Sequence, residues 1–371
     1  MNITCSKETL LKGIRIAESL LITKNIGKNN ILLDASDDLL KIFATDSETS
    51  VIVNLKADIS KNGSLAVFGK KIIDILSNLP EQDVIITSTE ENILKIKSLE
   101  KSINALFSLK GIPKNEYATI PSIEEDAVFK IGQMDLKNMI RKVISSASND
   151  DMRYVLNGIL FSIKRKSLKL IATDGRRLSV ITKDIEGPSK DENIIISKKV
   201  LSELEKLLGT EGECQIGFSS SKVFFHFDNI HIISRLIEGD FPDYQQVVPK
   251  TTEREVVFKK EELFNAVKRI SLIVDEKYKK ITITVKDNKA IFDSQDPDVG
   301  EAFEEINCVS VKPPFKEDFV ISFNSFFLLD VLRVIETDEV VFLFNQNINP
   351  VIIKEKDSDS FLSIIMPMKS N

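Results

Sequence analysis

Leu168-Lys-Leu-Ile-Ala-Thr-Asp174 repeats, almost residue for residue, the earlier segment Leu40-Lys-Ile-Phe-Ala-Thr-Asp46. The two aspartates lie 174 − 46 = 128 positions apart, and a degraded third copy, Ala290-Ile-Phe-Asp-Ser-Gln-Asp296, ends 296 − 174 = 122 positions later. A solenoid unit has roughly 20–50 residues, so a period of this length is too long for a solenoid. Each copy is long enough to bury a core of its own.

Two further landmarks keep the same order and nearly the same spacing. An apolar segment recurs after 196 − 68 = 128 and 323 − 196 = 127 positions, at residues 68–76, 196–204 and 323–331. A leucine near the start of each copy steps by 126 and 127 positions, as Leu10, Leu136 and Leu263. We therefore predict three tandem domains of one fold, at residues 1–121, 128–249 and 250–371.

Each copy has the pattern of a helix, several strands, a second helix and further strands. Apolar residues at helical spacing predict first helices that include 134–148 and 260–274, and second helices at 70–79, 197–208 and 324–335. Between them, β-rich runs such as 39–43, 168–172 and 281–285 predict strands. Two helices cannot cover both faces of a large sheet. The predicted fold class is therefore α+β, with both helices of each copy on one side of antiparallel strands.

Composition excludes several classes of protein. The 371 residues include 50 basic and 56 acidic side chains, three scattered cysteines and two histidines. That cysteine spacing suits neither a disulfide framework nor a zinc site, and no phosphate-loop, dinucleotide or hydrolase motif occurs. No run of about 18 apolar residues and no signal-peptide pattern is found. We expect a cytoplasmic protein, and this composition disfavours catalysis.

Positive charge gathers on the exposed faces of the predicted helices although the net charge is −6. Such faces attract phosphates without reading base sequence, and solvation alone also produces charged helix faces. Recurrence in three copies favours the nucleic-acid interpretation. The basic residues on these faces are Lys137, Arg141, Lys142, Lys198, Lys199, Lys206, Lys268 and Arg269.

An apolar surface is suggested by two segments that also contain turn residues. Glu238-Gly-Asp-Phe-Pro-Asp-Tyr-Gln-Gln-Val-Val-Pro249 is turn-rich yet apolar at several positions, and the chain ends near Ile364-Ile-Met-Pro-Met-Lys369. Pro367 cannot continue a central strand, which places Met366 and Met368 at an edge or surface. Methionine suits surfaces that accept several partners. Core filling with a frayed tail is the alternative.

Together with the triple repeat, four motifs resemble the bacterial replicative sliding clamps, the beta subunits of DNA polymerase III holoenzyme. The motifs are Arg153-Tyr-Val-Leu-Asn-Gly158, Ala172-Thr-Asp-Gly-Arg-Arg-Leu178, Gly239-Asp-Phe-Pro-Asp-Tyr244 and Met366-Pro-Met-Lys369. The resemblance spans the whole chain. It implies a head-to-tail homodimer, closed as a ring around duplex DNA, that tethers the replicative polymerase. It also implies loading by a clamp loader, and neither an active site nor a cofactor or metal.

The resemblance further implies a groove between the second and third domains that binds short peptide motifs of the polymerase, the clamp loader and other partners. Its lining would be Leu156, Thr173, Gly175, Arg176, Arg177, Leu178, Pro242, Val247, Ile364, Met366, Pro367 and Met368. Asp174 would then hold a turn rather than act in catalysis. Gln246 and Lys369 depart from the family pattern, which would weaken charge contacts to a peptide.

DNA contacts are implied for the basic helix residues and for two loops. The loop residues are Lys24, Lys28 and Asn149, although the loop 23–30 lacks the proline- and glycine-rich form usual in the family. For the ring seam, Leu106 and Phe107 of one copy would face Leu272 and Ile273 of the other.

Two rival interpretations remain at this level. An enzyme could use Asp293, Asp296 and Asp298 as a metal loop, but the glycine and the distal glutamate of a calcium loop are missing. A monomeric scaffold could carry the peptide groove without binding DNA. The mass in solution separates the scaffold from the ring.

Overall fold

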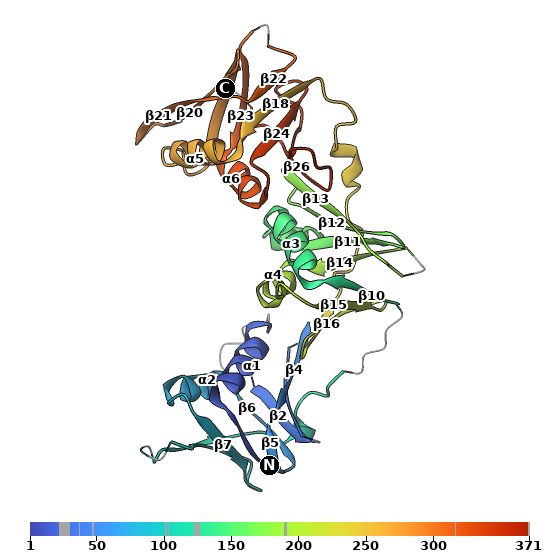
Figure 1. Cartoon of the computed structure of the whole chain (residues 1–371), viewed down its shortest axis with the longest axis vertical. Helices are drawn as coiled ribbons and strands as arrows, with labels where there is room; N and C mark the ends of the chain where they lie inside the picture. Colours follow the sequence, from blue (N-terminus) through green and yellow to red (C-terminus); the bar gives the residue numbers. More distant parts are fainter. Residues whose placement is uncertain are drawn as a thin grey trace. The chain divides into compact units, whose positions relative to one another are not determined.

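A computed structural model describes residues 1–21, 30–36, 38–46, 48–100, 102, 104–121, 127–188, 191–315 and 317–369 (Figure 1). Its packing forms two compact units. The first comprises Met1–Lys137, Glu186–Pro188 and Lys199–Leu236, and the second comprises Asn138–Ile185, Ser189–Lys198 and Ile237–Asn371. The predicted boundaries of the three domains stay a prediction, because this division passes through two helices of the second repeat.

One order of elements occurs three times along the chain. The first repeat contains β1 (Asn2–Ser6), α1 (Lys7–Ser19), β2 (Asn30–Ser36), β3 (Leu39–Thr45), β4 (Thr49–Lys56), β5 (Asp58–Lys61), β6 (Gly63–Phe68), α2 (Gly69–Asn78), β7 (Asp83–Ser88), β8 (Ile93–Ser98), β9 (Leu106–Lys110) and the 3-10 turn η1 (Lys114–Glu116). The second contains β10 (Ala127–Gly132), α3 (Gln133–Val143), the 3-10 turns η2 (Ile144–Ser146) and η3 (Asp151–Asn157), β11 (Gly158–Lys164), β12 (Ser167–Thr173), β13 (Arg177–Asp184), β14 (Glu192–Ser197), α4 (Lys198–Leu207), β15 (Glu213–Phe218), β16 (Lys222–Phe227), β17 (Ile230–Arg235) and η4 (Tyr244–Val247). The third contains β18 (Arg254–Lys259), α5 (Lys260–Ile270), β19 (Lys280–Lys286), β20 (Lys289–Asp296), β21 (Gly300–Asn307), β22 (Ser310–Lys312), β23 (Phe319–Asn324), α6 (Ser325–Val334), β24 (Glu339–Phe344), β25 (Val351–Glu355) and β26 (Phe361–Ile365).

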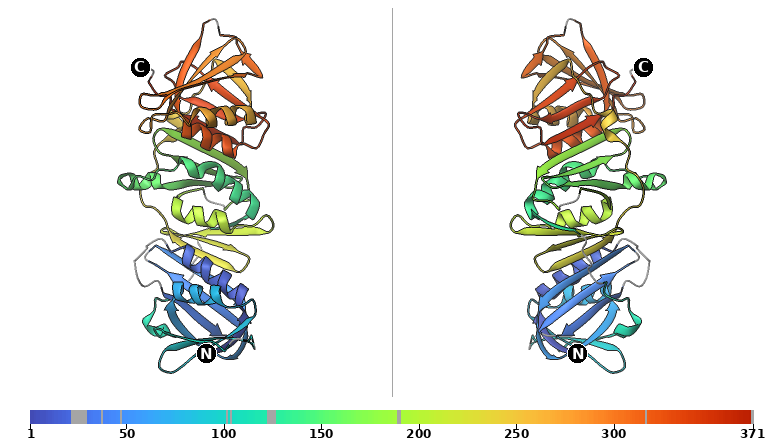
Figure 2. Two further views of the ribbon diagram at one scale, coloured as in Figure 1. Left: turned by 90° about the vertical axis from the view of Figure 1, so that its left-hand side faces the viewer. Right: turned by 90° about the vertical axis from the view of Figure 1, so that its right-hand side faces the viewer.

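This recurrence confirms the predicted α+β class with three tandem copies of one domain. Two helices accompany the strands of each copy, and α1 with α2, like α5 with α6, lie side by side in Figure 2. Two first helices end earlier than predicted. Helix α3 ends at Val143, where η2 turns the buried Ser146 hydroxyl to 2.8 Å from the Ser179 hydroxyl of β13. Helix α5 ends at Ile270.

All described strand pairs are antiparallel, and the larger sheets mix strands from neighbouring repeats. The first unit holds sheets in the orders β5-β1-β7-β8-β9 and β10-β15-β16-β17-β4-β3-β2-β6. The second holds β14-β11-β12-β13-β26-β25-β24-β18-β22 and β21-β20-β19-β23. Two equivalent contacts complete the larger sheets: β4 pairs with β17, and β13 pairs with β26. The last strand of one repeat therefore extends the sheet of the repeat before it.

The three aspartates of the repeated motif perform the same local task. In each copy the Oδ1 atom accepts hydrogen bonds from the backbone amides two and three residues further on, which closes the turn before the next strand. The bonds are Asp46 with Glu48 (2.8 Å) and Thr49 (2.7 Å), Asp174 with Arg176 (2.9 Å) and Arg177 (3.0 Å), and Asp296 with Asp298 (2.8 Å) and Val299 (3.0 Å). The degraded third copy is thus a true structural repeat.

Candidate functional site

The contact between β13 and β26 joins the second repeat to the third and lies within an apolar core cluster. Leu178 lies opposite Ile364, and both are buried. Beyond β26, the amide of Met366 donates to the carbonyl of Arg176 (2.9 Å), and that of Met368 donates to the carbonyl of Ser322 (2.8 Å). The C-terminal tail is thereby held between a strand of the second repeat and one of the third.

Around Leu178 and Ile364 lies a set of apolar residues that we call the junction patch. Its buried members are Leu160, Ile171, Leu178, Val180, Ile195, Ile352 and Ile364, and its half-buried members are Val155, Ile237, Phe241, Tyr244, Val248, Leu343 and Leu362. Only Leu178 and Ile364 among these were predicted groove residues. Strand alternation could have indicated the remaining buried members, because they share one sheet face.

The other predicted groove residues, apart from Arg177, are more exposed than the buried members of this patch. Gly175, Arg176, Pro242, Val247 and Met366 are exposed. Four more, Leu156, Thr173, Pro367 and Met368, are half-buried. Buried aliphatic side chains with an exposed methionine and a turn-rich rim form a surface on which apolar side chains of a peptide can dock.

Arg177 differs from this pattern, because its side chain is only 10% exposed and is bound within the protein. Its guanidinium donates to Asp174 Oδ2 (3.1 Å), to Asp330 Oδ2 (2.8 Å) and to the carbonyl of Ser145. It also stacks over the ring of Phe327, 4.2 Å from the centroid. The guanidinium therefore connects the Asp174 turn to α6 and to η2, and a lining role for Arg177 stays a prediction.

Replacement Arg177→Lys is expected to destabilise the fold by about 2 kcal/mol, because an ammonium cannot reproduce the planar fork of bonds. Urea unfolding of the full-length protein measures this loss. Arg176→Lys is the matched control, since Arg176 is exposed and should change stability by less than about 0.5 kcal/mol. Equal stabilities of the two variants would contradict the connecting role of Arg177.

Lys142 was predicted to face DNA, but it is only 5% exposed, so it cannot. Its ammonium lies 2.7 Å from Glu355 and 3.3 Å from Glu336, and it approaches the ring of Phe361 at 5.4 Å. A helical projection placed it on an open face, but β25 and β26 of the third repeat cover that face of α3. A buried charge of this kind requires its partner, so Lys142 joins repeats rather than binding a ligand.

The remaining residues predicted to contact DNA differ in whether their side chains already bind another part of the protein. Lys199 and Lys268 are exposed, and their ammonium groups make no hydrogen bond or ion pair with any residue that the structure describes. Burial lowers the pKa of Lys198, whose ammonium donates to the carbonyl of Ala147 (2.8 Å) and to Asn149 Oδ1 (2.9 Å). Lys24 and Lys28 lie outside the described residues. The side chains of the other four are bound within the protein. Lys137 donates to the carbonyl of Leu208 (2.9 Å). The three ion pairs are Arg141 with Glu336 (2.5 Å), Lys206 with Glu203 (2.7 Å) and Arg269 with Glu304 (2.5 Å).

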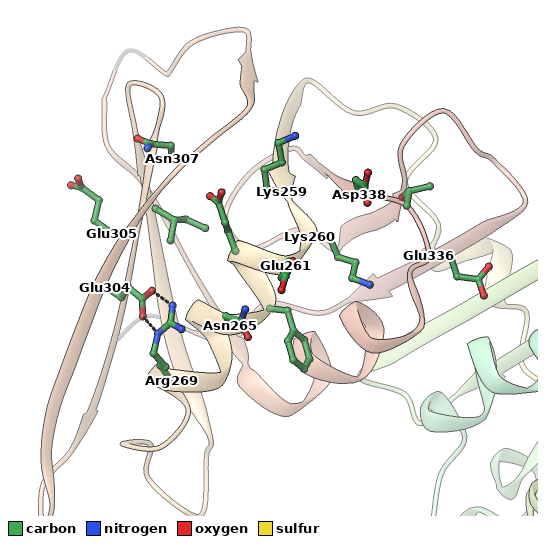
Figure 3. Close-up of a pocket in the computed structure, with 14 residues that line it drawn as sticks. Lys259, Lys260, Glu261, Asn265, Arg269, Glu304, Glu305, Asn307, Glu336 and Asp338 are labelled. Atoms are coloured by element: carbon green, nitrogen blue, oxygen red, sulfur yellow. Dashed lines mark hydrogen bonds and ion pairs between the residues drawn. The ribbon is translucent and has the colours of Figure 1, made fainter.

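Arg269 lines a hollow of about 950 Å³ between α5, β21 and the segment 336–338 (Figure 3). Its hydrogen bonds to Glu304 raise the pKa of the guanidinium and lower that of the carboxyl. Glu261, Asn265 and Asp338 also line the hollow, and its described lining contains no Cys, His or Ser. Mixed charges of this kind, with the Arg269–Glu304 pair already satisfied, suit a solvated surface.

The proposed seam residues lie at or near two free sheet edges. Strand β9 ends the five-stranded sheet and β21 ends the four-stranded sheet. Leu106 on β9 and Leu272 after α5 are exposed, whereas Phe107 and Ile273 are half-buried. Phe303 on β21 was missed by sequence reasoning, and it is 68% exposed. An exposed apolar edge strand readily pairs with another strand.

The candidate metal loop is the hairpin between β20 and β21. Asp296 closes its turn, and burial raises the pKa of Asp293. Within the described ranges, no group of three or more His, Cys, Asp and Glu residues could hold a metal ion. Likewise, the described helices include none with the length and apolar character to span a membrane.

Comparisons with known proteins give one consistent result. The chain matches, in order, the N-terminal (residues 1–121), central (130–243) and C-terminal (245–369) domain models of the DNA polymerase III beta subunit. A beta sliding clamp of Treponema pallidum is 30% identical over 377 positions covering 100% of both chains, and one of Staphylococcus epidermidis is 30% identical over 92% of this chain and 91% of the relative. The structures of the DNA polymerase III beta subunit of Pseudomonas aeruginosa (28% identity, TM-score 0.91) and of the DNA polymerase sliding clamp of Bacillus subtilis (25%, 0.93) are each covered over 100% of both chains.

Proposed function

Because the chain belongs to the family of DNA polymerase III beta subunits, the bacterial beta sliding clamps, we propose that two copies close head to tail around duplex DNA. Members of this family are non-catalytic processivity subunits of the replicative polymerase. The ring would hold the polymerase on DNA topologically, without reading base sequence. Replication takes place in the cytoplasm of bacteria, which is where we place the protein. The domain boundaries at 1–121, 128–249 and 250–371 belong to the same proposal.

The proposal of a closed ring rests on two strands that have no partner where the pattern of pairing between repeats would provide one. β4 of the first repeat pairs with β17 of the second, and β13 of the second pairs with β26 of the third. The next strand in this series is β21, and the strand equivalent to β17 and β26 in the first repeat is β9. Both are edge strands. A second copy can complete both series, because head-to-tail pairing of β21 with β9 closes a ring with two identical seams.

The register of this seam follows from the two completed junctions. Val51 of β4 lies opposite Ile232, and Ser179 of β13 lies opposite Ser363. By their positions in the ladders, the corresponding residues at the seam are Ala302 and Phe107. Antiparallel pairing then places Phe303 opposite Leu106, close to the exposed Leu272.

Charge favours the same pairing. Strand β21 carries Glu301, together with Glu304 and Glu305 that already pair with Arg269 and Lys289, whereas Lys110 lies on β9 and Lys95 and Lys97 lie on the adjacent β8. Opposite charges at a rim speed association and are screened by salt, with a Debye length of about 8 Å at physiological ionic strength. The seam would therefore weaken at high salt.

For DNA, we propose weak and salt-sensitive contacts from exposed basic side chains on helices. Lys199 and Lys268 would make these contacts, because their ammonium groups bind no other group in the described part of the chain. Residues whose charge is already paired contribute less, because an ion pair must break before a phosphate can bind. Weak contact suits a ring that slides.

The junction patch is the proposed docking site for peptide motifs of the polymerase catalytic subunit, the clamp loader and other partners. Its buried aliphatic floor and the exposed Met366 offer anchor positions for apolar side chains. The tail that carries Met366 is held in place by two backbone hydrogen bonds, so the site is formed before a peptide arrives.

After loading, the protein is expected to stay on a nicked circular DNA and to slide off once the circle is cut. Topological linkage is lost on a linear molecule, whereas ordinary phosphate contacts are equal on both forms. Gel filtration of the labelled protein with each DNA measures the retained fraction. Equal retention on both forms, or a monomer at micromolar concentration, would exclude the ring and favour the monomeric scaffold.

A further inference from the structure

The sulfur atoms of this chain divide into protected thiols and accessible thioethers. The three cysteines, Cys5, Cys214 and Cys308, are all buried. Burial raises the pKa of each of these thiols to about 12. The thiolate is the form that oxidants attack, so the folded chain keeps its cysteines in the unreactive form at neutral pH. An oxidant that meets the folded protein therefore reacts first with exposed methionine.

The six methionines of the chain differ in how easily solutes reach them. Two are buried and a third is half-buried, namely Met1, Met139 and Met368. The exposed ones are Met134, Met152 and Met366. Met366 adjoins the junction patch, because Ile364, two positions earlier, is a buried member of that patch. Its thioether is thus placed both to meet an oxidant and to contact a docked peptide.

The tail that carries Met366 is fixed by its backbone and not by the thioether. The amide of Met366 donates to the carbonyl of Arg176, and the amide of Met368 donates to the carbonyl of Ser322. Pro367, between them, has a fixed φ. Oxidation of the Met366 sulfur breaks none of these bonds, so it alters the chemistry of the docking surface while the tail stays in place.

We propose that Met366 is an oxidation site through which peroxide weakens peptide docking, an inference that rests on the proposed role of the junction patch. The oxidant is hydrogen peroxide or another peroxide. Its O–O bond breaks, one oxygen atom forms an S=O bond with the thioether, and the other leaves as water. The sulfur is oxidised by two electrons and the peroxide is reduced. Methionine sulfoxide reductases return the sulfoxide to the thioether, so the modification is reversible.

The sulfoxide acts against docking because it is polar where the peptide needs an apolar contact. A thioether is flexible and packs well against aliphatic side chains. An S=O group is hydrated in the free protein, and it loses that water when an apolar side chain of the peptide covers it. We expect the sulfoxide at Met366 to lower peptide affinity by about tenfold or more.

The test treats the full-length protein with increasing hydrogen peroxide and follows two quantities. Mass spectrometry of proteolytic fragments gives the extent of sulfoxide at each methionine. Fluorescence anisotropy gives the affinity for a labelled peptide with the clamp-binding motif of the polymerase catalytic subunit. Affinity should fall in step with sulfoxide at Met366 and return after treatment with both methionine sulfoxide reductases. Bound peptide should slow oxidation of Met366 but not that of Met134.

Leucine variants identify the responsible sulfur, because leucine is apolar and does not form a sulfoxide. Whatever its starting affinity, Met366→Leu should lose little affinity on peroxide treatment. The matched control Met134→Leu should lose as much as the parent, since Met134 is equally exposed. Circular dichroism should be the same before and after peroxide.

Two results would overturn the oxidation site and leave the docking proposal standing. One is an equal loss of affinity in Met366→Leu and in the parent. The other is full conversion of Met366 to the sulfoxide with unchanged affinity. An untreated parent that does not bind the peptide would refute the docking proposal itself, and the inference with it.

Discussion

Phe303→Asp is expected to convert the proposed dimer into a monomer, which halves the mass in solution to the 41.8 kDa of one chain. Phe303 occupies the ladder position of Ile52 and Val180, which the completed junctions bury to 9% and 8% exposure. In a free chain it is 68% exposed. Pairing with β9 would bury it against Leu106. A carboxylate there loses hydration without a partner, and each penalty of about 1.4 kcal/mol raises the dissociation constant tenfold.

The effect should be large because a head-to-tail ring has two identical seams, so that one substitution acts twice. Ile348→Asp is the matched control. Ile348 is also apolar and 71% exposed, but it belongs to neither edge strand. Light scattering at micromolar concentration gives the masses. A dimer that survives Phe303→Asp would contradict the proposed seam, and a monomer produced by Ile348→Asp would place the interface elsewhere.

The register can be tested separately with cysteine pairs. Opposed residues on paired strands have Cβ atoms about 4.5–5.5 Å apart, near enough for a disulfide after slight adjustment. Leu106→Cys combined with Phe303→Cys should therefore give a covalent dimer under mild oxidation. Leu106→Cys with Glu305→Cys is two positions out of register and should cross-link far less. Comparable yields from both pairs would mean that the register is wrong.

Met366→Ala together with Leu178→Ala is expected to weaken peptide binding by about 100-fold or more, while the dimer stays intact. Truncation of one anchor side chain in an apolar docking site commonly lowers the binding free energy by about 2 kcal/mol or more. The readout is fluorescence anisotropy with a labelled peptide that contains the clamp-binding motif of the polymerase catalytic subunit. Met366→Ala alone should also weaken peptide binding. It should leave the stability of the fold unchanged, because the exposed side chain contributes little to folding.

Met134→Ala is the control for Met366→Ala, because the two methionines are 43% and 40% exposed. It should leave peptide affinity unchanged. Leu178 is buried, so its truncation also removes core packing, and the unfolding midpoint of each variant must be measured beside its affinity. Unchanged affinity in the double variant would mean that the peptide site is misplaced.

Much of the fold could be predicted because the chain repeats itself. The Asp46, Asp174 and Asp296 motifs predicted three copies, and their carboxylates do close equivalent turns. Short-range patterns of this kind act within a few residues, so one sequence is enough to find them. Helix ends were less predictable, as with α3, because residues just beyond its end make contacts with a distant strand, such as the bond between the Ser146 and Ser179 hydroxyls.

Site residues were predicted unevenly for a related reason. The resemblance placed Leu178 and Ile364 in one site, and the pairing of β13 with β26 brings them together. The resemblance could not show what the side chain of Arg177 does. Its backbone belongs to the same turn, but its guanidinium binds Asp330 of the next repeat. Nor could a helical projection identify Lys142 as buried, since the covering strands come from residues more than two hundred positions later.

The −6 charge and the triple repeat thus came from the sequence by itself, together with the turn aspartates and the family. Tertiary structure alone decided which basic side chains remain unpaired and which strands lack a partner. Composition and periodicity depend on neighbours along the chain. Burial, ion pairing and open sheet edges depend on neighbours in space, and long-range contacts bring those together only when the chain folds.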